Sequence, residues 1–170
     1  SVGTSTLDVV ARHPERFKPV VGACRSLGFT TRVRSEDVAA DERCQCFVVD
    51  TMGELLQFYA ASDIAFVGGS LEPIGGHNLL EPAALGKPVI VGPHTFNTEE
   101  VAAKLIDAKA VLRVADEVEL GAALIRLFTR EQERSAMGQA AQHVLERERG
   151  AVARTVQIVE QVVAGQPVTV

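Results

Sequence analysis

The stretch IAFVGGSLEPIGGHNLLEPAALGKPVIVG, residues 64–92, decides the fold. It begins and ends with short apolar runs, 64–67 and 89–91, whose β-branched residues and neighbouring glycines are typical of buried strands. Between them a glycine-rich loop leads into residues 78–85, which have a helical composition and stop at Gly86. The stretch therefore predicts a strand, a glycine loop, a helix and a second strand.

Such a unit can bind an anion. The N–H groups at a helix start have no helical partner, and the helix dipole aims them at a ligand beyond the carboxyl end of the strand. Glycines at 68, 69, 75 and 76 let that ligand approach the backbone. Asn78 and Glu81 have the spacing of a capping pair, but the Glu81 carboxylate could equally accept from two adjacent ligand hydroxyls. The residues alone leave both interpretations of Glu81 open.

Length and composition favour one domain with a single core. The chain has 170 residues, of which 46% are hydrophobic. Its 17 basic and 22 acidic residues give a formal charge of −5, which argues against nucleic acid as the main partner. Cys24, Cys44 and Cys46 have no nearby histidine at metal-ligand spacing, so we expect reduced core thiols and no metal site. No apolar run approaches the roughly 20 residues of a spanning helix.

Strands and helices alternate along the rest of the chain. We expect further strands at 7–11, 29–33, 46–49 and 110–114, and further helices at 14–28, 51–62, 98–107 and after residue 116. Apolar strands that alternate with helices indicate a parallel sheet covered on both faces. The predicted class is α/β, with a doubly wound, Rossmann-like parallel sheet. In such sheets ligands bind beyond the carboxyl ends of the strands, where the loops after 7–11, 46–49, 64–67 and 89–91 would gather.

A second switch from strand to helix lies at residues 50–54. Thr51 and Glu54 have the spacing of a capping box, and Met52 has the flexible side chain of a gap-filler. These structural roles and a role in ligand binding both remain open from the residues alone.

Five runs of sequence resemble a known family. They are ARHPERF (11–17), DTMGELL (50–56), AFVGGSL (65–71), GGHNLLEPAALGKPV (75–89) and GPHTFN (92–97), and they are similar to the C-terminal half of 3-deoxy-D-manno-octulosonic acid (Kdo) transferases of lipopolysaccharide synthesis. The resemblance implies one half of a GT-B architecture, in which two Rossmann-like domains face each other across a cleft. Residues 1–170 would be the CMP-Kdo binding domain, and the acceptor-binding N-terminal domain would be absent from this chain.

The resemblance also implies which residues bind the donor. Arg12 would contact the nucleotide phosphate, and Glu81 would hold the ribose. His77 would donate to the phosphate or to the Kdo carboxylate, or else fix the loop. The expected donor-binding residues are Ala11 (usually Pro in the family), Arg12, Met52, Gly53, Glu54, Gly76, His77, Asn78, Leu79, Leu80 and Glu81. No catalytic residue is expected in this chain, because the general base would lie on the N-terminal domain.

The implied reaction transfers Kdo from CMP-Kdo to a lipid A precursor, with inversion and without a metal or other cofactor. No Asp-x-Asp motif is present, which fits a metal-independent enzyme. The acceptor and the membrane would be reached only through the N-terminal domain, at the cytoplasmic side of the bacterial inner membrane, so this chain alone would be inactive. The alternatives are a UDP-sugar-dependent GT-B transferase or epimerase, and a non-catalytic nucleotide-binding module. We assign no role to His13, Glu72 or His94.

Overall fold

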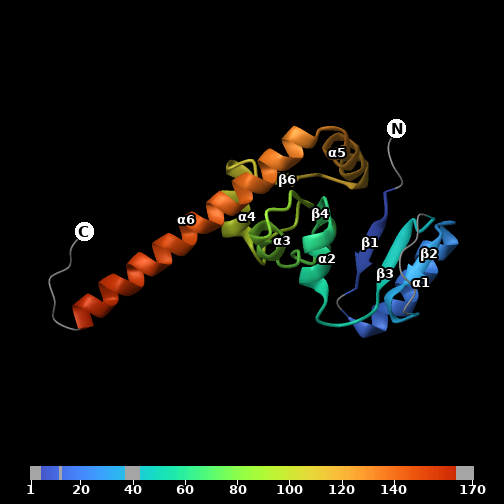
Figure 1. The fold of residues 1–170 in the computed structure, drawn as a ribbon, viewed down its shortest axis with the longest axis horizontal. Coiled ribbons are helices and arrows are strands. Elements are labelled where there is room, and N and C mark those ends of the chain that lie inside the picture. The colour runs from blue at the N-terminus through green and yellow to red at the C-terminus, as the bar shows by residue number, and fades with distance from the viewer. Residues whose placement is uncertain (1–4, 12, 37–42, 164–170) are drawn as a thin grey trace. The chain divides into compact units, whose positions relative to one another are not determined.

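The computed structural model describes residues 5–11, 13–36 and 43–163, with side chains described as far as residue 149. The chain divides into two compact units, Ser1–Ser62 and Asp63–Val170 (Figure 1), and each unit contains a three-stranded sheet. Each unit has buried clusters of its own, and the described strands pair with strands of the same unit.

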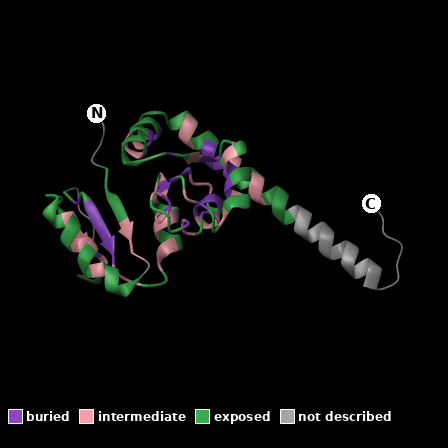
Figure 2. Ribbon diagram, turned by 180° about the vertical axis from the view of Figure 1, so that it is seen from behind, coloured by how far each residue is buried: buried purple, intermediate pink, exposed green. Residues whose placement is uncertain are grey.

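The first unit is built on the buried strand β3 (Cys46–Val49), whose four residues are all buried (Figure 2). Strands β1 (Leu7–Val10) and β2 (Thr31–Val33) pair with β3 on either side, both in parallel. Helix α1 packs against β3. The helices of this unit are the 3₁₀ turns η1 (Pro14–Arg16) and η2 (Arg34–Glu36), α1 (Phe17–Ser26) and α2 (Leu55–Ala61).

The second unit contains the stretch quoted at the outset. Its sheet has the order β4 (Ala65–Phe66), β5 (Val89–Val91) and β6 (Val111–Arg113), again all parallel. Helix α6 packs against each of the other three helices of the unit. These helices are α3 (Leu80–Ala84), α4 (Glu99–Asp107), α5 (Glu117–Thr129) and α6 (Glu131–Val163).

Helices cover both faces of the second sheet, as predicted for a doubly wound fold. Successive side chains of a strand point to opposite faces. Val89 and Val91 join a cluster with Ala83 of α3 and Leu105 of α4, whereas Ile90 joins another cluster that includes Leu127 of α5. The α/β class and the parallel arrangement are thus confirmed.

Within residues 64–92, two elements are shorter than predicted. Strand β4 has two residues within the expected 64–67, although the N–H of Val67 still donates to Ile90 O at 3.0 Å. Helix α3 has five residues within the expected 78–85. Among the described residues, no helix is both long enough and apolar enough to span a bilayer.

Candidate functional site

In the first unit, the carboxyl ends of the three parallel strands lie at one edge of the sheet. Val10 and Val33 lie opposite Val49 and Val48 of β3, so the segments that follow these parallel strands begin side by side. Ala11, Arg34 and the loop 50–54 belong to this edge, as predicted for Ala11 and the loop. Arg12 lies outside the described residues.

Both oxygens of the Glu54 carboxylate are engaged within this unit. Arg34 donates from Nη2 to Oε1 at 3.1 Å, and the Thr51 hydroxyl donates to Oε2. The Thr51 bond, followed by the Arg34 bond, lowers the pKa of Glu54 below its usual value, because both stabilise the charged form. The carboxylate is therefore a fixed anion at this edge.

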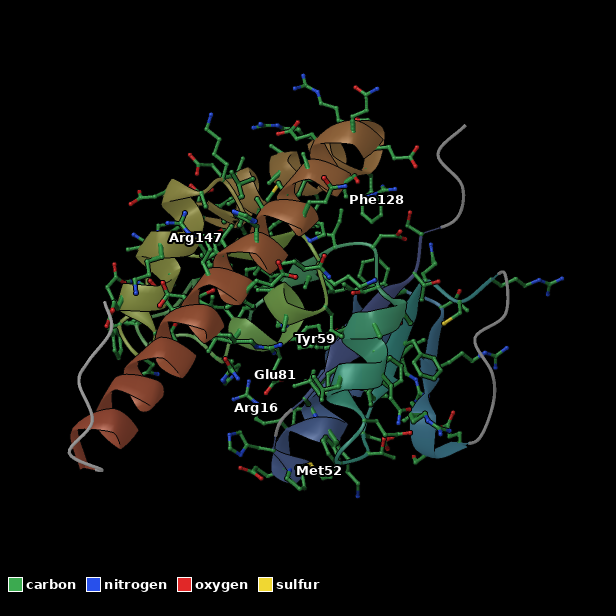
Figure 3. The ribbon with its side chains drawn as sticks, turned by 60° about the vertical axis from the view of Figure 1, so that its left-hand side comes forward. Arg16, Met52, Tyr59, Glu81, Phe128 and Arg147 are labelled. Carbon is green, nitrogen blue, oxygen red and sulfur yellow. The ribbon has the colours of Figure 1, made fainter. Side chains whose placement is uncertain are left out.

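Of the two interpretations of Thr51 and Glu54, the capping box does not form. Helix α2 begins after Glu54 itself, and no side chain caps it. The intervening Gly53 has φ +86°, a left-handed turn that carries Thr51 away from the first helical N–H groups, so the two side chains bond to each other instead. Met52 is no gap-filler either, since it is 65% exposed (Figure 3).

In the second unit, the glycine loop folds back on itself. The N–H of Gly76 donates to Gly69 O at 2.8 Å, and the N–H of His77 donates to Gly68 O at 3.1 Å. Gly69, Gly75 and Gly76 all have positive φ, which only glycine adopts readily. The His77 ring packs over this turn: a Cβ added at Gly69 would lie 3.5 Å from His77 Nε2. The loop-fixing interpretation of His77 thus has direct structural support.

Ser70, which no local sequence pattern singled out, links the glycine loop to the segment after β5. Its hydroxyl is completely buried, donates to Val67 O at 2.6 Å and accepts from the N–H of Gly92 at 2.8 Å. Its carbonyl accepts from the N–H of His94 at 2.9 Å. The two loops that follow the parallel strands β4 and β5 are therefore fastened together.

The start of α3 differs from the predicted capping pair. Asn78 Oδ1 accepts from the N–H of Leu80 at 3.0 Å, but its amide nitrogen donates to Glu81 Oε1 at 3.1 Å, and Leu79 is the N-cap. Glu81 (Figure 3) is thus held by a side chain and does not reach back to the Asn78 N–H. Within the described part of the chain, the N–H groups of Asn78 and Leu79 have no hydrogen-bond acceptor. Asn78 is exposed and Leu79 is only 1% exposed, so the N–H of Asn78, and not those of Gly76, His77 or Leu80, is the donor open to an anion.

A charged cluster supports the loop that follows β5. The buried Thr95 donates from its hydroxyl to Glu99 Oε2 at 2.6 Å and accepts from Arg113 Nη2 at 2.7 Å. Arg113 also lies 3.3 Å from Glu99 Oε1. The Thr95 bond and then the Arg113 bond lower the pKa of Glu99, so this carboxylate is charged at neutral pH.

Each unit therefore brings its own predicted residues together. In the first, Ala11 and residues 52–54 share an edge; in the second, residues 76–81 follow a turn that is fastened to the loop after β5. That the two groups bind one ligand stays a prediction. The described residues contain no group of three or more His, Cys, Asp or Glu side chains that could hold a metal ion.

Comparison with known proteins agrees with this arrangement. A family model described as glycosyl transferases group 1 matches residues 32–144. The chain belongs to this family. It is 40% identical over 153 residues to the 3-deoxy-D-manno-octulosonic acid transferase of Haemophilus influenzae and 37% identical over 153 residues to that of Bordetella pertussis, in each case over 89% of this chain. The chain spans 36% of the length of each of these relatives.

A solved structure covers the same part of the family. It is the C-terminal CMP-Kdo binding domain of WaaA from Acinetobacter baumannii, which is 38% identical, with a TM-score of 0.80. The match includes 82% of this chain and 73% of that domain. The predicted resemblance to the C-terminal domain of Kdo transferases is confirmed, and so is the Rossmann-like class.

Proposed function

We propose that the chain is the donor-binding domain of a Kdo transferase and that its substrate is CMP-Kdo. The observation that carries this proposal is the similarity to a domain described as binding CMP-Kdo, at 38% identity and a TM-score of 0.80. The loops that carry the family's motifs also follow the carboxyl ends of parallel strands, where α/β sheets bind ligands. The matched relatives named as Kdo transferases favour this proposal over a UDP-sugar enzyme.

In this proposal the donor phosphate accepts hydrogen bonds from the exposed N–H group of Asn78 and from Arg12. Breaking the glycosidic bond leaves negative charge on the CMP phosphate, and fixed donors stabilise that charge without reorganising. Glu81 has one carboxylate oxygen bound to Asn78, and its other oxygen accepts from a ribose hydroxyl. Glu54 keeps Arg34 beside the loop 52–53, which lines the base.

The remaining parts of the reaction belong to the whole enzyme. The general base and the lipid A acceptor site lie on its other domain, and transfer proceeds with inversion at the cytoplasmic face of the inner membrane. The residues of this chain bind and orient the donor and hold the departing CMP. A donor domain without the base binds CMP but does not transfer Kdo.

Calorimetric titration of the chain with CMP, UMP and UDP tests the proposal. We expect CMP to bind most tightly, and a preference for UDP would refute the assignment. Glu81→Gln and Arg12→Ala should each weaken CMP binding by about 1.5–3 kcal/mol, the value of a hydrogen bond to a charged group. Glu72→Gln is the matched control, because Glu72 is an exposed carboxylate in the same loop region and has no proposed role.

A further inference from the structure

Asn97, in the loop between β5 and α4, contacts three successive carbonyl groups of the glycine turn. Its backbone N–H donates to Gly75 O at 3.2 Å, and its side-chain amide donates to Gly76 O at 3.3 Å and, at the limit of bonding distance, to Ile74 O at 3.5 Å. The neighbouring Phe96 closes the same side of the turn. A Cβ added at Gly75 would lie 2.4 Å from the Phe96 ring and 2.5 Å from the Asn97 amide nitrogen.

The peptide groups of this turn are held at both ends. In the peptide between Gly75 and Gly76, the oxygen accepts from the Asn97 N–H and the nitrogen donates to Gly69 O. In the peptide between Gly76 and His77, the oxygen accepts from the Asn97 side chain and the nitrogen donates to Gly68 O. A flip of either peptide would therefore break two hydrogen bonds.

Without such bonds this turn would have several accessible conformations. Gly75 and Gly76 have φ +102° and +75°, and glycine populates positive and negative φ with similar ease. The next residues, 78 and 79, carry the two N–H groups that have no acceptor within the described residues. The direction of those N–H groups depends on the conformation of the turn that precedes them.

We infer that Asn97 is a positioning residue for donor binding: its side-chain amide prevents a flip of the peptide between Gly76 and His77 and so keeps the N–H group of Asn78 aimed at the donor phosphate. The inference rests on the proposed function, because it takes CMP as the ligand. Asn97 itself does not touch the ligand in this account. The amide side chain is required, since an aspartate would place a charged oxygen against the carbonyl oxygens of Ile74 and Gly76.

Two measurements on the whole 170-residue chain test the inference. The first is amide hydrogen exchange in the absence of ligand, compared among the unaltered chain, Asn97→Ala and Asn97→Asp. We expect exchange at His77, whose peptide group loses the side-chain hydrogen bond, to become about 3- to 10-fold faster in Asn97→Ala, as the ordinary net strength of a hydrogen bond implies, and faster still in Asn97→Asp. Exchange in β5 and the unfolding temperature should stay unchanged.

The second measurement is the affinity for CMP. Both variants should bind CMP about 3- to 10-fold more weakly, whereas Gln139→Ala, which removes an exposed amide on α6, should bind it normally. If the unaltered chain binds CMP, and Asn97→Asp leaves either the amide exchange or the affinity for CMP unchanged, the positioning role is overturned. Failure of the unaltered chain to bind CMP would instead overturn the proposed function, and the exchange data would still show whether Asn97 fixes the turn.

Discussion

Gly138 marks the place where α6 crosses the end of α3, and its replacement tests the packing of the second unit. A Cβ built at Gly138 would lie 2.0 Å from Gly86 O and 3.0 Å from the Gly86 carbonyl carbon. Gly86 is held in place by the hydrogen bonds on either side of its carbonyl group, because its own N–H donates to Ala83 O and the N–H of Lys87 donates to Pro82 O, both at 3.0 Å. In Gly138→Ala we therefore expect α6 to be displaced from α3.

The expected change in the free energy of unfolding follows from a comparison with Gly121, a glycine inside α5. A Cβ at Gly121 meets nothing within 4 Å. Gly121→Ala should stabilise the protein by about 1 kcal/mol, the difference in helix propensity between the two residues. Gly138→Ala gains the same propensity but also incurs an overpacking cost of about 1–3 kcal/mol, at the upper end because the contacting atom belongs to the backbone. This overpacking cost is the expected gap between the two variants.

Urea unfolding followed by far-ultraviolet circular dichroism measures this gap. The chain has no tryptophan and one tyrosine, so intrinsic fluorescence is a poor probe. Both glycines lie in the second unit, so the stability of each variant should be taken from the unfolding transition of that unit. Amide exchange in α3 should become faster in Gly138→Ala alone, since α6 covers α3. If Gly138→Ala proves as stable as Gly121→Ala, the close approach of α6 to Gly86 is refuted.

Three further predictions follow from buried and paired groups. Ser70→Ala leaves the buried N–H of Gly92 without its acceptor and should destabilise the protein by about 1–3 kcal/mol in urea unfolding, while Ser26→Ala, at an exposed helix end, should change stability by less than about 0.5 kcal/mol. Burial, together with the hydrogen bond that the Cys46 thiol donates to Cys24 Sγ, raises the pKa of Cys46 to about 12. A thiol reagent should therefore modify Cys24 in the folded chain and spare the buried Cys44 and Cys46. The free energy of unfolding should fall as the pH rises above 9.0, because the thiol of the unfolded chain loses its proton first. Because hydrogen bonds lower the pKa of Glu99, the free energy of unfolding should fall as the pH is lowered from 4.5 through that pKa. Glu99→Gln should reduce this dependence on pH. If the variant shows the same dependence, the pairing of Glu99 with Thr95 and Arg113 is contradicted.

The sequence by itself determined the order of the elements and the family. The apolar run 46–49 predicted β3 with its observed bounds, and the run 89–91 did the same for β5, because a strand buried on both faces needs consecutive apolar residues. The glycine-rich motifs identified the loops that carry the expected donor-binding residues. Periodicity and local composition act over a few residues, so they are sufficient for predictions of this kind.

Only the tertiary structure decided how the polar side chains are used. Spacing left capping boxes at Thr51–Glu54 and Asn78–Glu81 as one of two interpretations of each pair. In both pairs the side chains bond to each other instead, because a turn or a shifted helix start moved the backbone donors out of reach. The role of Ser70, and the contact of Asn97 with a turn more than twenty residues earlier, depend on two loops meeting where parallel strands end. That meeting is a consequence of strand pairing between distant segments, which no local pattern encodes.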